Sequence, residues 1–245
     1  MTKSYGQSWY GVNGYSGKTE KWSSSDTEAR FNENMTNPEK RAALEHFGWT
    51  RDNISYKFNA DGFRSEEFTY EPNDSVLFLG CSLTMGVGLD LESTWAYKVA
   101  SSLGLRRYNL GVGGGSPDMC FRLAYHWIPL LRPKYVVMLT PNSVRMEIVM
   151  DRSIRMFLPT GRPIDEFYFN WLSHPANADM HKLRCVMGVQ TICNNIGVPL
   201  VEISIEDKKF LLKEYSWARD LTHFGSAWNH KVSNIFLQKI SELSN

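Results

Sequence analysis

Apolar residues gather in short runs that are too brief for buried helices. Three such runs are SVLFLG at 75–80, KYVVMLT at 134–140 and VPLVEISI at 198–205. RRYNLG at 106–111 has the length of a fourth strand and leads into glycines. Runs of this kind are typical of strands that are covered on both faces. Stretches with helical composition alternate with them, at 92–103, 117–131, 178–196 and 225–243.

Strands that alternate with helices predict a parallel sheet with helices on both faces. We therefore expect a three-layer α/β/α, flavodoxin-like domain. Pro117 suits the first turn of its helix, and Gly197 is an expected stop for the helix before it. In such folds the binding and reactive groups lie at the carboxyl ends of the strands.

The remaining segments show weaker patterns. Residues 1–37 are rich in Ser, Gly, Asn and Tyr and lack strong periodicity, so we expect an extended arm that packs on the domain or on a partner. A short helix is predicted at 38–46 and a turn at Asp61-Gly62. Polar and aromatic alternation at 151–172 suggests a hairpin-like insertion or a lid. We divide the chain into an N-terminal extension, 1–70, and a main α/β domain, 71–245, with an insertion at about 151–175.

Composition narrows the possible functions. The 245 residues are 42% hydrophobic, enough for one large core, and the formal net charge is +1. No Lys/Arg run with interleaved aromatics appears, so nucleic acid is not an expected partner. We find neither a signal peptide nor an apolar run of membrane-spanning length. The expectation is a cytoplasmic or virion-associated protein that has no membrane partner.

The cysteines do not predict a metal or disulfide framework. There are four, and their spacing fits no zinc pattern. Cys185 and Cys193 are eight residues apart on a predicted helix, about 12 Å of axial rise, which is too far for a disulfide. We expect all of them to be reduced.

Polar or glycine-rich residues follow each of the first three predicted strands. These are Gly80-Cys81-Ser82-Leu83-Thr84, then the stretch 109–116, then Thr140-Pro141-Asn142-Ser143. A fourth group, Asp220-Leu221-Thr222-His223, stands just before the last helix. All four groups should meet at one edge of the sheet.

These four groups, in this order, resemble the sequence blocks of the SGNH (GDSL-like) hydrolases over about residues 75–240. GCSLTMG is similar to the nucleophile block, NLGVGG to the second, TPNS to the third and DLTH to the last. YKFNADGFR, at 56–64, resembles a segment upstream of the serine in some of these proteins. The resemblance implies that Ser82 is the nucleophile, with Asp220 and His223 as its activating pair. It also implies an oxyanion hole made by Ser82, Gly114 and Asn142.

The chain departs from the family pattern at two places. Cys81 stands where the nucleophile block usually has Asp, and Thr140-Pro141-Asn142-Ser143 replaces a common Gly-x-Asn-Asp. The residue types still suit the chemistry. A serine hydroxyl needs a base to remove its proton, imidazole titrates near neutrality, and a carboxylate fixes the imidazole tautomer. No cofactor and no metal is expected.

Each residue also has a plainer interpretation. Ser82 and Asn142 could cap helices, and Asp220 could be a turn former. The run Gly113–Gly115 could be a phosphate-binding turn, although a third motif glycine is missing. Further alternatives are a metal role for His174 and His181, and a thiol nucleophile or a buried small residue at Cys81. Arg64 could line the site or pin the upstream segment to the core, and a structural salt bridge is the plainer interpretation.

The predicted function is hydrolysis of a carboxylic ester through an acyl-serine intermediate. The resemblance implies short acyl groups, such as the acetyl groups of carbohydrates, so the expected partner is a small-molecule or glycan ester. Aromatic residues of the arm and of 157–171 could stack on sugars. Two alternatives remain: an O-acetyltransferase acting on glycans, and a non-catalytic structural or carbohydrate-binding protein that docks into a larger assembly through its arm.

Overall fold

A four-stranded parallel sheet forms the centre of the molecule. The computed structural model describes residues 9–12, 14–150, 153–157, 170–171, 174–207 and 216–243. Within them the strand order is β4-β3-β5-β8, and all neighbouring pairs are parallel. The strands are β3 Ser75–Leu79, β4 Arg106–Asn109, β5 Tyr135–Thr140 and β8 Leu200–Ser204.

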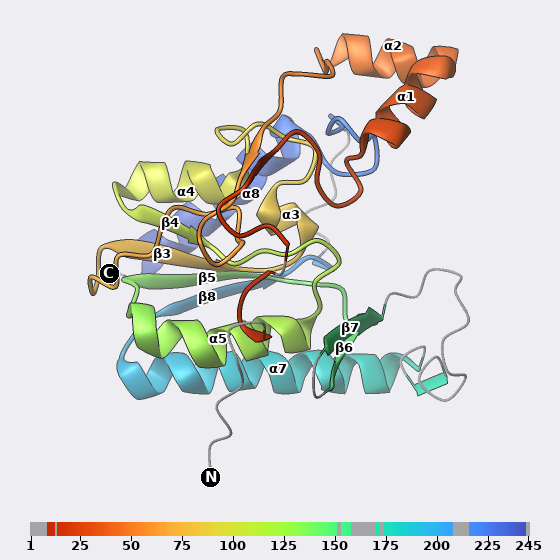
Figure 1. Ribbon diagram of the computed structural model, residues 1–245. Coiled ribbons are helices and arrows are strands. Elements are labelled where there is room, and N and C mark those ends of the chain that lie inside the picture. The colour runs from red at the N-terminus through yellow and green to blue at the C-terminus, as the bar shows by residue number, and fades with distance from the viewer. Residues whose placement is uncertain are drawn as a thin grey trace.

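Helices cover both faces of this sheet, so the predicted three-layer α/β/α, flavodoxin-like architecture is confirmed (Figure 1). One layer holds α4 Trp95–Leu103 and α8 Ser226–Glu242, and the other holds α5 Pro117–Leu131 and α7 Pro175–Ile196. The hydroxyl of Ser116 accepts a hydrogen bond from Met119 N and caps α5. α7 begins at Pro175, three residues earlier than expected, because proline suits a first helical turn.

Alternate side chains of β3 point to opposite faces of the sheet and pack into two separate hydrophobic cores. Leu77 and Leu79 belong to the core beneath α5 and α7, and Val76 and Phe78 to the core beneath α4 and α8. All four are fully buried. Residues 76–79 of β3 are therefore apolar at every position, because helices cover both faces of this strand.

The N-terminal segment contains more regular structure than its sequence indicated. β1 Thr19–Glu20 pairs antiparallel with β2 Tyr56–Lys57, and α1 Glu28–Thr36 precedes the predicted helix α2 Pro38–His46. The expectation that residues up to 37 are extended is thus wrong for α1. Only Phe31 and Asn34 of α1 are buried, so a helical hydrophobic pattern was too weak to detect.

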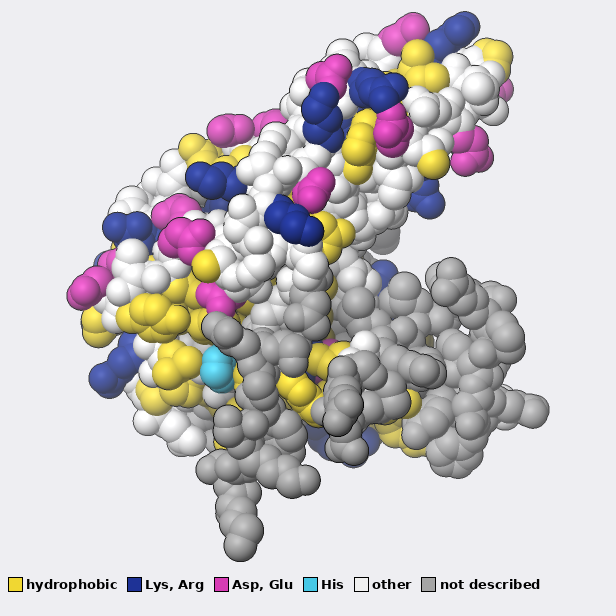
Figure 2. Space-filling model, in the orientation of Figure 1, with side chains coloured by type: hydrophobic (Ala, Val, Ile, Leu, Met, Phe, Trp, Pro, Cys, Tyr) yellow, Lys and Arg dark blue, Asp and Glu magenta, His cyan; other side chains and the backbone are white. Residues whose placement is uncertain are grey.

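α1 and α2 project together from the three-layer body (Figure 1). Asn37 joins them, and its side chain accepts hydrogen bonds from Glu39 N and Lys40 N at the start of α2. Lys/Arg and Asp/Glu side chains are interspersed over this projection (Figure 2).

A β-hairpin follows β5. It pairs β6 Met146–Met150 with β7 Ser153–Phe157 in antiparallel register. The hairpin begins earlier than the insertion predicted from about 151. Residues 158–169, which carry about half of that insertion and part of the expected aromatic platforms, lie outside the described residues. No helix among the described residues is long and apolar enough to cross a membrane.

Candidate active site

Ser82 lies directly beyond the carboxyl end of β3, at the first residue of the one-turn helix α3 Ser82–Met85. The turn between strand and helix depends on Gly80, whose φ is 154°. A Cβ at this position would lie 2.8 Å from Leu139 O of the neighbouring strand. Glycine therefore allows the chain to turn against β5 and to present Ser82, which is 6% exposed.

His223 and Asp220 reach this serine from the loop before α8. The Nε2 atom of His223 lies 2.8 Å from Ser82 Oγ. Its Nδ1 atom lies 2.7 Å from Asp220 Oδ2. The three residues predicted from the sequence blocks are thus joined in one chain of hydrogen bonds. This geometry allows His223 to take the Ser82 proton while Asp220 fixes the imidazole tautomer.

The local backbone supports Asp220. Its Oδ1 atom accepts the N–H groups of Thr222 and His223, at 3.1 and 3.0 Å. The side chain is 0% exposed. Burial acts to raise the pKa of Asp220, but the hydrogen bonds and charge of His223 and the donors of Thr222 outweigh it, so the pKa lies well below its ordinary value. The carboxylate is therefore ionised at neutral pH.

Ser25, from the N-terminal segment, contacts the same pair. Its hydroxyl donates to Asp220 Oδ2 over 2.8 Å and lies 3.4 Å from His223 Nδ1. Sequence reasoning missed this residue. The only signal was the serine run at 23–25, which has no distinctive spacing to the other blocks.

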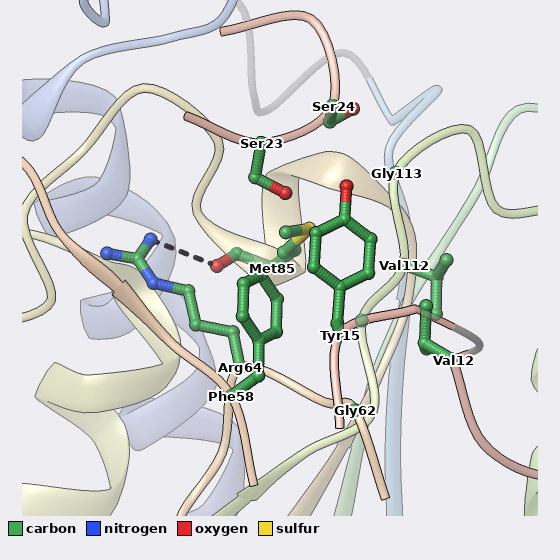
Figure 3. A pocket seen from close by; sticks show the side chains of 11 residues that line it. Val12, Tyr15, Ser23, Ser24, Phe58, Gly62, Arg64, Met85, Val112 and Gly113 are labelled. Carbon is green, nitrogen blue, oxygen red and sulfur yellow. Dashed lines mark hydrogen bonds between the residues drawn. The ribbon is translucent and has the colours of Figure 1, made fainter. Parts of the chain in front are cut away.

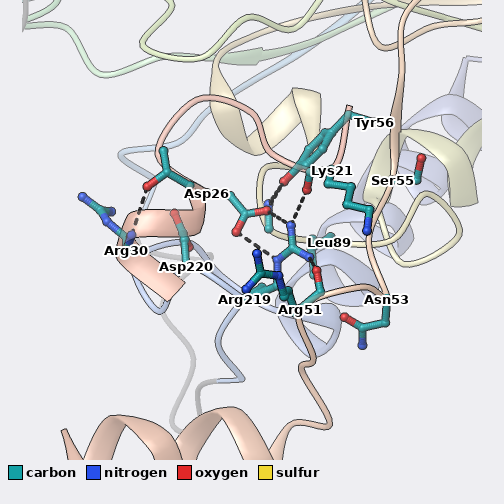
Figure 4. Close-up of polar contacts among 12 residues, drawn as sticks. Lys21, Asp26, Arg30, Arg51, Asn53, Ser55, Tyr56, Leu89, Arg219 and Asp220 are labelled. Carbon is teal, nitrogen blue, oxygen red and sulfur yellow. Dashed lines mark hydrogen bonds and ion pairs between the residues drawn. The ribbon is translucent and has the colours of Figure 1, made fainter. Parts of the chain in front are cut away.

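A buried ion pair holds this part of the N-terminal segment in place (Figure 4). Arg219 donates from Nε and Nη2 to the two carboxylate oxygens of Asp26, at 3.0 and 2.7 Å. The two side chains are 0% and 1% exposed. Tyr56 donates to the same carboxylate over 2.6 Å, and the Arg219 guanidinium lies 4.0 Å from the ring centroid of Trp22. Since Asp26 follows Ser25 and Arg219 precedes Asp220, the pair fixes both partners of the Ser25–Asp220 bond.

The glycine loop after β4 is tied to the serine helix. Asn109 donates from Nδ2 to Thr84 O over 2.8 Å and accepts from Gly111 N over 2.9 Å. Gly114, in this loop, has a φ of 76°, a conformation that favours glycine. The predicted donor Gly114 therefore lies in a loop held against the helix that carries Ser82.

Asn142 follows β5 at the same edge of the sheet. Its Oδ1 atom accepts a hydrogen bond from Val144 N over 3.0 Å, and this bond restricts the orientation of the side-chain amide. Within the described residues its Nδ2 atom makes no hydrogen bond, and the backbone N–H groups of Ser82 and Gly114 make none either. Three donors without a hydrogen bond in the described residues therefore follow β3, β4 and β5, at the same edge of the sheet.

The surroundings of Arg64 and Cys81 indicate structural roles for both side chains. The expected salt bridge of Arg64 is wrong, since no carboxylate pairs with it among the described residues. Its guanidinium instead donates to four backbone carbonyls, those of Ser55, Met85, Gly86 and Leu89. Arg64 thus holds the 56–64 segment to the loop after α3. Cys81 is 2% exposed, in agreement with a buried small residue.

The remaining candidates lie away from Ser82 or have other partners. His181 Nε2 is 3.4 Å from Asp118 Oδ1. In the described part of the chain no three His, Cys, Asp or Glu side chains are grouped so that they could hold a metal. All four cysteines are buried and free.

Comparisons with known proteins add little to what the geometry of the site indicates. No family model matches the chain, and no curated protein matches it by sequence. Among solved structures, one similar chain is that of a candidate acylhydrolase from Bacteroides fragilis. The two share 14% sequence identity with a TM-score of 0.35, over 72% of this chain and 93% of the other. Similarity at this level is too low to assign an activity.

Proposed function

We propose that the protein is a serine hydrolase of the SGNH type that cleaves short-acyl carboxylic esters through an acyl-serine intermediate. One observation carries the proposal: Ser82 Oγ, His223 and Asp220 are joined by hydrogen bonds of 2.8 and 2.7 Å. The serine lies at a strand end, where reactive groups of open α/β sheets collect.

The first half of the reaction forms the acyl-enzyme. Ser82 Oγ attacks the ester carbonyl carbon as His223 Nε2 takes the hydroxyl proton. The carbonyl oxygen becomes an oxyanion, and the N–H groups of Ser82 and Gly114 and the Asn142 amide donate to it; each such donor is worth about 10²–10³ in rate. Collapse breaks the bond to the alcohol oxygen, which leaves with the proton from His223. Asp220 stabilises the imidazolium throughout.

The second half restores the enzyme. A water molecule gives a proton to His223 Nε2 and attacks the acyl carbon. The second tetrahedral intermediate collapses, the proton returns to Ser82 Oγ, and the carboxylic acid leaves. We propose acetyl groups of carbohydrates as the substrate class, on the resemblance of the sequence blocks, and an acceptor sugar in place of water would turn the same site into a transferase.

The test is hydrolysis of p-nitrophenyl esters by the wild type and by Ser82→Ala, together with labelling by a fluorophosphonate probe. Ser101→Ala, on the exposed side of α4, is the matched control. We expect saturable turnover that falls with acyl length, and labelling that Ser82→Ala alone abolishes. Equal turnover or equal labelling in Ser82→Ala would refute Ser82 as the nucleophile.

A further inference from the structure

A cavity of about 190 Å³ lies between the N-terminal segment and the loop after β4 (Figure 3). Its walls come from segments that are far apart in the sequence. The N-terminal segment, the 56–64 segment, helix α3 and the glycine loop all contribute, and the principal side chains are Val12, Tyr15, Ser23, Phe58, Met85 and Val112.

Three residues of the cavity wall lie close in the chain to residues of the candidate active site. Met85 is the last residue of the one-turn helix that Ser82 begins. Gly113 precedes the proposed oxyanion donor Gly114, and Ser24 precedes Ser25, which bonds to Asp220. Ser24 packs so tightly against Gly113 that a Cβ on this glycine would overlap the Ser24 hydroxyl. The N-terminal segment therefore closes one wall of this cavity, and the lining residues Ser24 and Gly113 are the chain neighbours of Ser25 and Gly114.

The walls favour an uncharged, apolar occupant. Val12, Phe58, Met85 and Val112 present aliphatic, aromatic or thioether groups. Arg64 is the one charged residue among those that line the cavity. Its guanidinium is already engaged by four backbone carbonyls, so it has little capacity left for an anion.

Three hydroxyls on these walls, those of Tyr15, Ser23 and Ser24, make no hydrogen bond within the described residues. Ser23 is 4% exposed, and its Oγ atom is buried without a hydrogen bond. The Tyr15 hydroxyl makes no hydrogen bond either. In Figure 3 the Ser23 hydroxyl points toward the side chains of Met85 and Tyr15, and the Tyr15 hydroxyl is at the end of its ring nearer Ser24. A buried hydroxyl without a partner is unfavourable, so an occupant with one polar atom facing Ser23 would relieve this cost.

We propose that this cavity is a subsite for a compact, uncharged, ring-sized group of the ester substrate that carries one hydrogen-bonding atom. The inference rests on the proposed esterase function for its role in catalysis. The size is adequate, because an apolar cavity of about 150 Å³ accommodates benzene. The ring belongs to either the alcohol or the acyl end of the ester, and a pair of esters that carry the same ring at opposite ends separates these two arrangements.

The direct test is a titration with 4-fluorophenol followed by fluorine NMR. We expect saturable binding by the wild type and by Ser82→Ala alike, because the cavity does not need the nucleophile. Val12→Phe fills the cavity and should abolish binding, whereas Val149→Phe adds the same bulk at a position that is 43% exposed and should not. Ser23→Ala removes one hydrogen bond and should weaken binding by about 2- to 10-fold.

The kinetic test uses cyclohexyl acetate and methyl cyclohexanecarboxylate, which place the same ring at opposite ends of the ester. Val12→Phe should raise KM for one of them, and that substrate identifies the end that enters the cavity. Probe binding without any ester turnover would support the cavity and refute only the proposed function. Turnover without saturable probe binding, probe binding that both Val12→Phe and Ser23→Ala leave unchanged, or an unchanged KM for both esters would overturn the inference and leave the proposed function standing.

Discussion

Asp220 keeps its charge in a fully buried position because donors surround both of its oxygens. Ser25, Thr222 and the His223 Nδ1–H donate to Oδ2, while two backbone N–H groups donate to Oδ1. An ionised carboxylate only accepts hydrogen bonds, so His223 must carry its proton on Nδ1. Its Nε2 atom is then free to accept from Ser82, which is the tautomer that the proposed reaction requires.

The lowered pKa of Asp220 predicts a specific pH dependence of stability. A folded-state pKa below the ordinary 3.8 means that the ionised group stabilises the fold above about pH 3.8. This contribution is lost as the pH falls through the folded-state pKa. Asp220→Asn should therefore be less stable than the wild type at neutral pH, and the difference should shrink toward acid. Urea unfolding between pH 7 and pH 2 measures it, and a difference that stays constant with pH would contradict an electrostatic origin.

The same substitution should lower kcat by about 10³–10⁴-fold, because an asparagine no longer fixes the imidazole tautomer. Near-normal turnover by Asp220→Asn would remove Asp220 from the proposed mechanism.

Ser25→Ala should lower kcat by about 10-fold and leave KM almost unchanged, since one hydrogen bond to a charged group is lost. Ser25 is a positioning residue, so the acid limb of the kcat–pH profile should also move. Ser25→Thr keeps the hydroxyl and should restore both values. A Ser25→Ala variant whose activity falls only in proportion to its loss of folded protein would contradict the positioning role of Ser25.

The sequence revealed some of these residues and not others. Asp220 and His223 are three apart and precede a helix, so they could be recognised without a structure. Ser25 could not, because its bond to Asp220 spans 195 residues and the serine run around it has no periodicity. A contact of that length depends on the path of the whole N-terminal segment.

The turn between β3 and α3 is sterically constrained. Gly80→Ala would place a Cβ against Leu139 O at 2.8 Å in a backbone conformation that side chains rarely adopt. Gly104, at the end of α4, has a φ of 64° and open space around it. Gly104→Ala should cost about 1–2 kcal/mol of unfolding free energy from the backbone conformation alone. Gly80→Ala should cost at least about 1–3 kcal/mol more. The midpoints of denaturant unfolding compare the stabilities of the two variants. Equal losses of unfolding free energy in Gly80→Ala and Gly104→Ala would argue against a steric role for Gly80.

Elements with a buried apolar stripe or a run of strong helix formers were predictable, and those with neither were not; α2 was recognised by its helix formers, since only its Leu44 is buried. The helices at 38–46 and 117–131 match α2 and α5, and the strands of the sheet lie within the predicted runs. α1 was missed because its surroundings provide only two buried positions. β1 and β2 are two residues each, too short for any alternation to appear.

The body and the N-terminal segment are joined by the Asp26–Arg219 pair. Asp26→Asn removes the charge that compensates a fully buried guanidinium, and this should cost about 3–5 kcal/mol. We expect residues 19–30 to become accessible to protease and the proposed esterase activity to fall. Asp52→Asn is the matched control, because Asp52 and its partner Lys21 are 65% and 66% exposed and should contribute little. Equal effects of the two substitutions would show that the buried pair is not the anchor.

The bonds that close the site also set an order of events during synthesis. All four strands of the sheet have been made once Ser204 is added, yet Ser82 has no base until His223 follows it 141 positions later. Ser25 must wait for Asp220, and at about 5–20 residues per second that delay is about 10–40 s. Contacts of such separation also form slowly after release. In the proposed mechanism Ser82 of a nascent chain is thus inactive until the segment with Asp220 and His223 meets the segment with Ser25, so activity would report that these segments have folded together.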